Sequence, residues 1–228
     1  MTGSAFLRHP LLSECGVAHG FGVRGANEPG GCVRPRQVHG IAVMEARPGA
    51  GPQDADAIVS DVPGLPVGVV TADCVPLLVA ELGGARVAAI HAGWRGLAAG
   101  VVAAGLAALG RLGARPSRLR AAIGPHIGPC CYEVDGPVVA ALEARFGPAT
   151  RAALRPARPE HAMLDLARLV REECLRAGLT PDAIGALAGA CTRCDESRFH
   201  SFRRDGARAG RLVHFVSAGV ATPGCLTT

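Results

Sequence analysis

The sequence predicts an α+β fold, formed as a single domain over residues 1–228 with mixed β-sheets flanked by helices. Short apolar runs recur through the chain, and several are apolar on both faces, as expected for strands buried between two layers. Longer stretches have helical periodicity. The 228 residues are 49% hydrophobic, which is enough for one sizeable core, and no repeat or linker divides the chain.

The first part of the chain, residues 1–35, is rich in Gly and Pro and predicts an irregular lead-in. Apolar and β-branched runs then predict strands at residues 38–45, 57–60, 67–72, 77–82, 85–91, 120–123, 186–190 and 212–216. Residues 151–161 are polar and contain prolines, so they are expected to form a connector without regular structure.

Helices are expected at residues 97–112, 136–146 and 163–177. The first has Ala and Gly on all faces, which indicates a well-buried helix. The second follows Asp135 as N-cap and has a proline in its first turn. The third is amphipathic and ends at Gly178.

Charge and composition exclude several functions. The chain carries 24 Arg and no Lys, so it lacks the phosphate-binding lysine of a P-loop and the amine of a Schiff-base enzyme. The arginines are scattered and only 4% of residues are aromatic, which argues against nucleic-acid binding. No signal peptide is evident, and the longest apolar run, residues 97–109, is too short to span a membrane. We expect a cytoplasmic monomer or weak homo-oligomer that binds an anionic small molecule.

Three polar residues stand where short apolar runs end: His39, Cys74 and His91. Two His and one Cys can hold a Zn²⁺ ion and leave its fourth position open, as a catalytic zinc requires. From spacing alone, each histidine could equally have a structural role, because a scattered His-Cys-His set is a weaker pattern than HExxH or paired CxxC.

The nine cysteines do not suggest a disulfide framework, because their number is odd and no secretion signal is seen. Cys191 and Cys194 form a CxxC motif that stands alone. A second pair at zinc-ribbon spacing is absent, since Cys130 and Cys131 are adjacent. We interpret these residues as small buried thiols.

Six segments carry a resemblance and occur in this order: QVHG at 37–40, DADA at 54–57, TADCVP at 71–76, HAGWRG at 91–96, IGPHIGPCCYE at 123–133 and SFRRDG at 201–206. Over roughly residues 16–216 the chain resembles the YfiH/laccase-domain family, also called the multicopper polyphenol oxidoreductase family. The resemblance implies an α/β fold with mixed sheets and zinc bound by His39, Cys74 and His91. It also implies a purine nucleoside phosphorylase that deaminates adenosine, with purine nucleoside and phosphate as substrates.

The chain departs from the family between Gly22 and Gln37, where relatives have a longer stretch that includes a helix. If that stretch covers one side of the pocket, substrate range or activity changes. The older family name implies a polyphenol oxidase, but a multicopper centre relies on His-x-His pairs, and the eight His of this chain form none. Copper remains a possible substitute in the zinc site, because it binds nitrogen and sulfur ligands more tightly than zinc.

The motif residues suit the two reactions. In deamination, a carboxylate must move a proton, and Asp73 and Glu133 are the candidates. In phosphorolysis, His126 or His200 would protonate the departing base. Arginines near the motifs are expected to grip phosphate, and one aromatic ring to contact the purine: Arg95, Arg203, Arg204 and Tyr132. Structural ion pairs are the alternative for the arginines.

Two other functions remain open at this point. Cys74 and His91 could act as nucleophile and base of a cysteine hydrolase, with Asp73 or His39 orienting the base. A peptidoglycan-precursor editing enzyme would use the same site on a larger anionic substrate. The metal content of the protein distinguishes the cysteine hydrolase from the zinc enzyme, because a zinc-bound thiolate is not free to attack a substrate.

Overall fold

A six-stranded sheet forms the middle layer of the computed structural model, which describes residues 6–49 and 51–219. Its strands lie in the order β11-β7-β5-β6-β3-β2. Their bounds are β2 Val43–Glu45, β3 Ala57–Ser60, β5 Val75–Glu81, β6 Val87–Ala92, β7 Leu119–Ile123 and β11 Ile184–Ala186. Parallel and antiparallel pairs occur in the same sheet, so it is mixed, as predicted.

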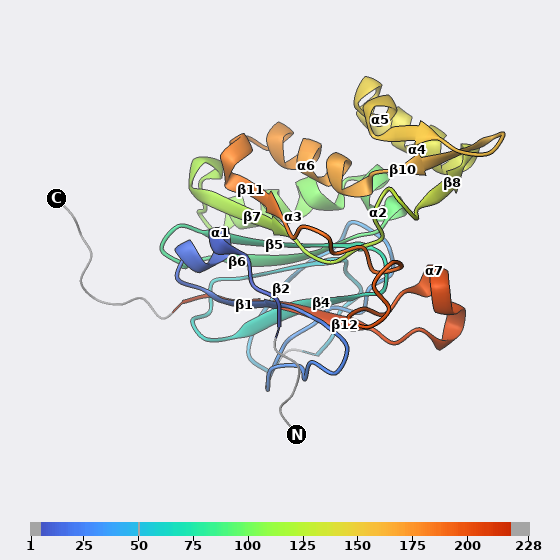
Figure 1. Ribbon diagram of the computed structural model, residues 1–228. Coiled ribbons are helices and arrows are strands. Elements are labelled where there is room, and N and C mark those ends of the chain that lie inside the picture. Colours follow the sequence, from blue (N-terminus) through green and yellow to red (C-terminus); the bar gives the residue numbers. More distant parts are fainter. Residues whose placement is uncertain (1–5, 50, 220–228) are drawn as a thin grey trace.

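A second, three-stranded antiparallel sheet packs against one face of the first (Figure 1). It consists of β1 Ala18–Phe21, β12 Leu212–Ser217 and β4 Pro66–Thr71. Helices α3 (Val101–Arg111) and α6 (Leu166–Arg176) cover the opposite face of the six-stranded sheet. The central sheet is therefore buried on both sides.

Strand β5 shows how the sequence produces this layering. Leu77 and Val79 lie in the core between sheet and helices, whereas Leu78 and Ala80 lie in the core between the two sheets. All four are completely buried. Alternate side chains of a strand point to opposite faces, so a strand that is apolar at every position must be covered twice. The predicted α+β class with flanking helices is confirmed.

The helices differ from prediction mainly at Gly100. The predicted helix at residues 97–112 is divided into α2, Trp94–Ala99, and α3, because Gly100 has a left-handed backbone with φ of 105°. Helix α4, Gly136–Phe146, has the predicted bounds. Helix α6 starts later than predicted, at Leu166, because the Asp165 carboxylate accepts the Arg168 N–H at 3.0 Å and caps it.

The expected irregular lead-in is corrected by the structure. It contains a short helix, α1 (Pro10–Glu14), and strand β1, which pairs with β12 almost two hundred residues later in the chain. The local Gly and Pro content predicts loops, but pairing with a distant partner decides the conformation. His214 of β12 is fully buried beside this junction, where Nδ1 accepts the Gly22 N–H at 3.2 Å and Nε2 lies 2.9 Å from Thr71 Oγ1.

The predicted connector at residues 151–161 is also partly regular. Helix α5, Pro148–Ala152, is followed by β9, Leu154–Pro156, and β10, His161–Leu164. These two strands and β8, Glu133–Asp135, make a small antiparallel sheet in the order β8-β10-β9.

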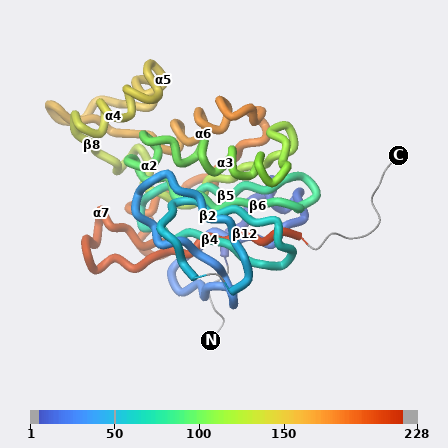
Figure 2. Tube along the Cα trace, turned by 180° about the vertical axis from the view of Figure 1, so that it is seen from behind, coloured from blue at the N-terminus to red at the C-terminus, as the bar shows by residue number. Residues whose placement is uncertain are grey.

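One end of the molecule gathers several short elements. Helix α2, strand β8 and helix α7, Phe202–Asp205, lie at the same end in both views (Figures 1 and 2). Three 3₁₀ turns complete the described elements, Pro116–Arg118, Pro181–Ala183 and Gly206–Arg208. None of the helices within residues 6–49 and 51–219 has both the length and the apolar character required to cross a bilayer.

Candidate metal centre and its cavity

The three predicted metal ligands meet at the end of the molecule that carries α2 and α7. Their ligand atoms all lie within 4.8 Å of one another. Cys74 directly precedes β5, and His91 lies in β6, where it pairs with Pro76. His39 approaches from the turn before β2. Its imidazole ring centroid lies 4.8 Å from that of His91, with the rings nearly perpendicular.

A buried carboxylate, Asp56, holds two of these ligands in place. Its Oδ1 accepts a hydrogen bond from His91 Nδ1 at 2.8 Å and from the His39 N–H at 2.9 Å. Its Oδ2 accepts from the N–H groups of Val38 at 3.1 Å and Gly40 at 2.6 Å. Because His91 Nδ1 donates to Asp56, its Nε2 is left to face the metal position. This carboxylate–histidine arrangement is common in zinc sites and fixes both tautomer and ring orientation.

The same hydrogen bonds correct the predicted strand at residues 38–45. Only β2 is a strand, and the preceding residues turn around the Asp56 carboxylate. His39 has a positive φ of 60°, an uncommon conformation for a residue other than glycine. Gln37 secures the start of the turn, because its side-chain amide exchanges two hydrogen bonds with the backbone of Val70, at 2.7 and 2.8 Å.

Gly93 is required by the close approach of the ligands. A Cβ atom at this position would lie 3.0 Å from His39 Cδ2 and 3.1 Å from Cys74 Sγ. Gly93 is also the N-cap of α2, so the helix begins immediately beside the metal position. The sequence contained both Asp56 and Gly93 within the family segments, but nothing local indicated their roles.

The metal-free centre favours a thiolate beside a protonated imidazole. Burial acts to raise the pKa of Cys74, but hydrogen bonds with His39 and His91 lower it to about 7. Burial acts to lower the pKa of His91, but hydrogen bonds with Asp56 and Cys74 raise it to about 9. The pKa of Asp56 is lowered despite its burial, because His91 and backbone N–H groups donate to it. The thiolate is the form of Cys74 that can bind a metal ion, and His91 would have to give up its Nε2 proton to become a ligand.

These three residues open into a cavity of about 630 Å³. This volume is within the range of roughly 300–1,000 Å³ usual for small-molecule sites. Beyond the ligands, its walls include Gln37, Asp73, Trp94, Tyr132, Phe202 and Arg203. Trp94, Tyr132 and Arg203 also border a neighbouring hollow of about 220 Å³.

Four arginines line the main cavity: Arg36, Arg95, Arg203 and Arg211. Among the described residues, only Arg36 of these has a carboxylate partner, Asp54. Arg95 lies over the Trp94 ring at 4.3 Å from its centroid, and Arg203 lies over Tyr132 at 5.3 Å. Arg95 and Arg203, which the sequence predicts to bind an anion, both line the cavity, whereas Arg36 and Arg211 were not singled out from the sequence.

Asp73 lines the cavity, but its carboxylate is already engaged. Oδ1 accepts from Thr192 Oγ1 at 2.6 Å, and Oδ2 accepts from the Arg203 N–H at 2.6 Å. Its backbone has a φ of 98°, and its carbonyl accepts from the Ile127 N–H at 2.9 Å. These contacts anchor α7 and a neighbouring loop to the metal centre, which suits a positioning residue better than the expected proton carrier.

Four predicted site residues, Arg204, Glu133, His126 and His200, are not among the walls of the main cavity. The Arg204 guanidinium contacts the Asp205 carboxylate and the carbonyls of Thr192, Arg193 and Phe199, so it is committed to structure rather than phosphate. The Glu133 carboxylate lines the smaller hollow and pairs with Arg158 at 2.6 Å.

His126, expected to protonate the departing base, is also placed elsewhere. Its Nδ1 bonds to the Gly124 carbonyl at 2.8 Å, and burial lowers its pKa. His200 packs against Gly210 and likewise is not among the cavity walls. Neither position supports the proton transfer expected from the sequence.

The segment between Gly22 and Gln37 reaches the cavity. Pro35 and Arg36 line it directly. Upstream, the Arg24 N–H donates to the Arg198 carbonyl at 2.8 Å, which joins the segment to the loop before α7.

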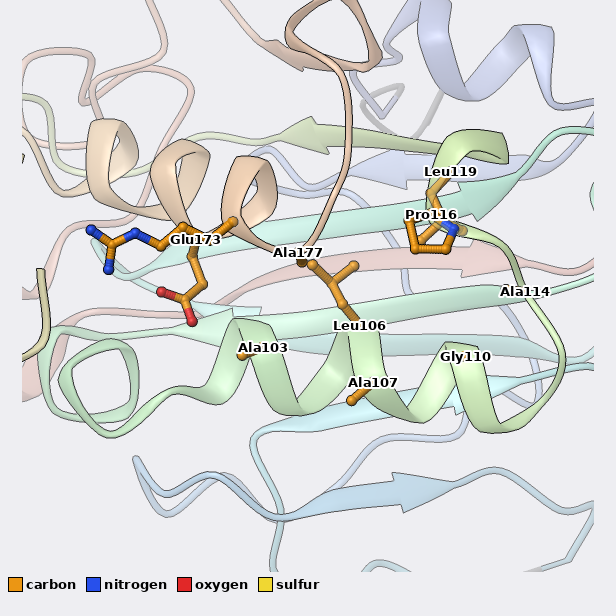
Figure 3. Close-up of a pocket in the computed structure, with 10 residues that line it drawn as sticks. Ala103, Leu106, Ala107, Gly110, Ala114, Pro116, Leu119, Glu173 and Ala177 are labelled. Carbon is orange, nitrogen blue, oxygen red and sulfur yellow. The ribbon is translucent and has the colours of Figure 1, made fainter.

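A separate cavity of about 370 Å³ lies between α3 and α6 (Figure 3). Its walls are mainly apolar, with Leu106, Pro116 and Leu119 facing Ala177 across the gap. Glu173 reaches toward α3 from α6 and pairs with Arg145. The metal-ligand groups found in the described chain do not line this cavity.

The donor set of the larger cavity fits one metal ion with an open position. Two imidazoles and a thiolate are three protein ligands, and a carboxylate supports one of them. In the part of the chain that the structure describes, this is the one metal-ligand group that contains histidine. A cluster of several coppers finds no ligand set there.

Known proteins resemble this chain over most of its length. The model of the multi-copper polyphenol oxidoreductase laccase family matches residues 22–219. A Pseudomonas aeruginosa protein named purine nucleoside phosphorylase is 43% identical over 180 residues, which are 79% of this chain and 71% of that protein. The adenosine deaminase RL5 of an unknown prokaryotic organism is 34% identical over 78% of this chain and 72% of its own length. The crystal structure of YlmD from Geobacillus stearothermophilus superposes with a TM-score of 0.85 at 28% identity, covering 96% of this chain and 98% of that one.

Proposed function

Because this chain belongs to the multi-copper polyphenol oxidoreductase laccase family, we propose that it is a metal-dependent purine nucleoside phosphorylase that also deaminates adenosine. The observation that carries the proposal is the arrangement of His39, Cys74 and His91 at one side of a cavity lined by four arginines. Relatives named for both activities support the choice of substrate.

We propose zinc as the metal. Zinc accepts nitrogen and sulfur ligands in a four-coordinate arrangement, and three protein ligands leave one position for the reaction. When bound, it supplies Lewis acidity at neutral pH. Asp56 contributes by keeping the Nε2 atom of His91 available, and Gly93 by leaving room for the three ligands. Copper would bind the same donors.

The cavity arginines are proposed to hold phosphate. Arg95 and Arg203 lie over aromatic rings and have no carboxylate partner in residues 6–49 and 51–219, so their positive charge is available to an anion. Guanidinium groups match phosphate oxygens in bidentate geometry. A phosphate held at this wall would face a nucleoside whose base lies toward Tyr132 and Trp94.

Tyr132 is the proposed hydrogen-bond donor to the base. Burial and the nearby Cys74 raise its pKa to about 12, so the phenol keeps its proton at neutral pH. The ring is fixed beneath Arg203, which also donates from Nη1 to the Glu133 carbonyl at 2.9 Å. A neutral donor in this place can stabilise negative charge that develops on a departing purine.

The test is chromatography of adenosine incubated with the protein, with and without phosphate. Wild type should release adenine only when phosphate is present, whereas it should form inosine even when phosphate is absent. Cys74→Ala and His91→Ala should lose both products together with the metal ion of the His39–Cys74–His91 centre. Cys32→Ala is the matched control, because Cys32 is also half-buried but is not part of the His39–Cys74–His91 group. Metal-loaded wild type that converts adenosine to neither product would refute the proposal.

A cysteine hydrolase is the second candidate, and one observation favours it. Cys74, His91 and Asp56 are arranged as nucleophile, base and orienting carboxylate. The two candidates differ in what happens to the thiol. Under the zinc proposal, iodoacetamide alkylates Cys74 quickly in chelator-treated protein and slowly after zinc is restored. Activity that survives chelation and disappears on alkylation would favour the hydrolase instead.

A further inference from the structure

Four cysteines from two distant segments meet beside the cavity. Cys130 and Cys131 follow the Gly-rich loop after β7, and Cys191 and Cys194 form the CxxC motif of the loop before α7. Their sulfur atoms all lie within 4.8 Å of one another. The expectation of an isolated CxxC with buried thiols was therefore wrong. The second pair is adjacent in sequence, and Cys130 and Cys194 are exposed.

We propose that Cys130, Cys131, Cys191 and Cys194 bind a second zinc ion, in a closed structural site distinct from the His39–Cys74–His91 centre. Four thiolates and no open position are the usual ligand set of structural zinc. The proposal does not rest on the proposed nucleoside activity. It rests on the convergence of four sulfurs around one point.

The distances agree with a tetrahedral site. Cys194 Sγ lies 3.5 Å from Cys130 Sγ and 3.3 Å from Cys131 Sγ. Zinc–sulfur bonds of about 2.3 Å in a tetrahedron place the sulfurs roughly 3.8 Å apart. A small outward movement of two side chains is sufficient. The convergence on a single point suits one ion, whereas an iron–sulfur cluster would hold its cysteines further apart around several metal atoms.

The surroundings supply what four negative thiolates need. The Gly128 N–H donates to Cys191 Sγ at 3.3 Å, and Arg193 Nη1 donates to Cys131 Sγ at 3.6 Å. N–H groups and a nearby cation are the outer contacts that orient ligands and offset the charge of a tetrathiolate site. The absence of a side chain at Gly128 permits this close approach. A Cβ atom there would lie 3.3 Å from Cys130 Sγ and 3.4 Å from Cys191 Cβ.

The four thiols do not form disulfides in the structure, where all of them are free. The shorter of the two sulfur–sulfur contacts above, 3.3 Å, is well beyond a bond of about 2.05 Å. Cys194 contacts both Cys130 and Cys131, so any single disulfide would leave other thiols beside it. A metal ion uses all four at once.

The second ion would clamp together two loops that build the catalytic cavity. The loop ending in Cys130 carries Ile127, which lines the cavity and donates to the Asp73 carbonyl. The loop containing Cys191 carries Thr192, which donates to the Asp73 carboxylate at 2.6 Å. Two backbone hydrogen bonds join the loops as well: the His126 N–H donates to the Ala190 carbonyl at 3.2 Å, and the Thr192 N–H donates to the His126 carbonyl at 2.9 Å. Loss of the ion should therefore loosen the cavity wall without removing the catalytic ligands.

Metal counting by plasma mass spectrometry tests the proposal on the full chain. Wild type purified under reducing conditions should hold two zinc ions per chain. Cys74→Ala should keep one, and the double variant Cys191→Ser with Cys194→Ser should also keep one. Cys32→Ser should keep both, since Cys32 belongs to neither group. A wild type with one ion that Cys74→Ala loses completely would overturn the proposal.

Cobalt gives a second readout that requires no change to the cluster. Metal-stripped Cys74→Ala protein, titrated with Co²⁺, should develop the intense visible absorption of tetrahedral cobalt thiolate and saturate at one equivalent. Zinc should then bleach the signal. No thiolate absorption would contradict the second site even if the double variant fails to fold. Thiol titration that finds the four cysteines oxidised in freshly purified protein would contradict it too.

Discussion

Asp56→Asn should weaken metal binding more than any other change that leaves the ligands intact. Each carboxylate oxygen accepts two hydrogen bonds, one pair from His39 and His91 and the other from Val38 and Gly40. An asparagine can accept with only one of its two terminal atoms. Whichever way the amide is turned, its NH₂ group faces two donors.

Both orientations are costly for an identifiable reason. If the amide oxygen faces His91, the N–H groups of Val38 and Gly40 lose their acceptor and the turn around His39 loosens. If the NH₂ faces His91, it donates to Nδ1 and moves the imidazole proton to Nε2, where the metal must bind. Loss of such a supporting carboxylate typically costs about 10- to 100-fold in metal affinity. Losing two hydrogen bonds to a charged acceptor should destabilise the metal-free fold by about 2–4 kcal/mol.

The assay is competition for zinc against a chromogenic chelator, with urea unfolding of the metal-free protein alongside. Asp54→Asn is the matched control, because Asp54 lies two residues earlier, is half-exposed and pairs only with Arg36. It should change neither quantity measurably. An Asp56→Asn protein that binds zinc within threefold of wild type would refute the role assigned to this carboxylate.

Three further predictions concern pH, backbone and anion binding. Burial lowers the pKa of His214 from 6.5 to about 3, so the unfolded state takes up a proton at this residue before the folded state does. The free energy of unfolding should therefore fall as the pH drops below 6.5, by about 2 kcal/mol at pH 5. Urea titrations of His214→Gln should show a smaller fall. Gly100→Ala should destabilise the protein by about 1–3 kcal/mol in urea unfolding, because Gly100 has a positive φ. Gly110→Ala should instead stabilise it by about 0.5–1 kcal/mol, because Gly110 lies inside α3 with open space around it. Equal effects of the two changes would contradict the left-handed conformation assigned to Gly100. Arg203→Ala should raise the KM for phosphate about tenfold and leave the melting temperature unchanged. Arg204→Ala should lower the melting temperature, because its guanidinium holds backbone carbonyls. The reverse pattern would disprove the assignment of phosphate binding to Arg203 and of a structural role to Arg204.

The sequence was most informative where burial alone determines conformation. Strand β3 and helix α4 have the predicted bounds, because an apolar run and a capped amphipathic segment each carry their information locally. Strand β1 carries little local information, since its partner β12 is near the other end of the chain. Pairing across that distance can be seen only in the fold.

The site shows the same division. The proposed ligands His39, Cys74 and His91 could be selected from residue type and position at the ends of apolar runs, and the structure brings them together. Asp56 could not, because a buried aspartate before a strand resembles any polar residue at a strand boundary. Arg203 and Arg204 cannot be told apart in the sequence, yet they are adjacent positions of the short helix α7, and adjacent positions of a helix point in different directions. Arg203 lines the cavity, whereas Arg204 contacts backbone carbonyls.

The three proposed metal ligands differ in depth, and this difference has a consequence for metal exchange. His39 is exposed, Cys74 is half-buried and His91 is nearly inaccessible to water. A metal ion held by these residues would therefore be most accessible to solvent on the His39 side, with His91 as its deepest ligand. Loading and stripping would proceed through that side, so a chelator would reach the ion past His39.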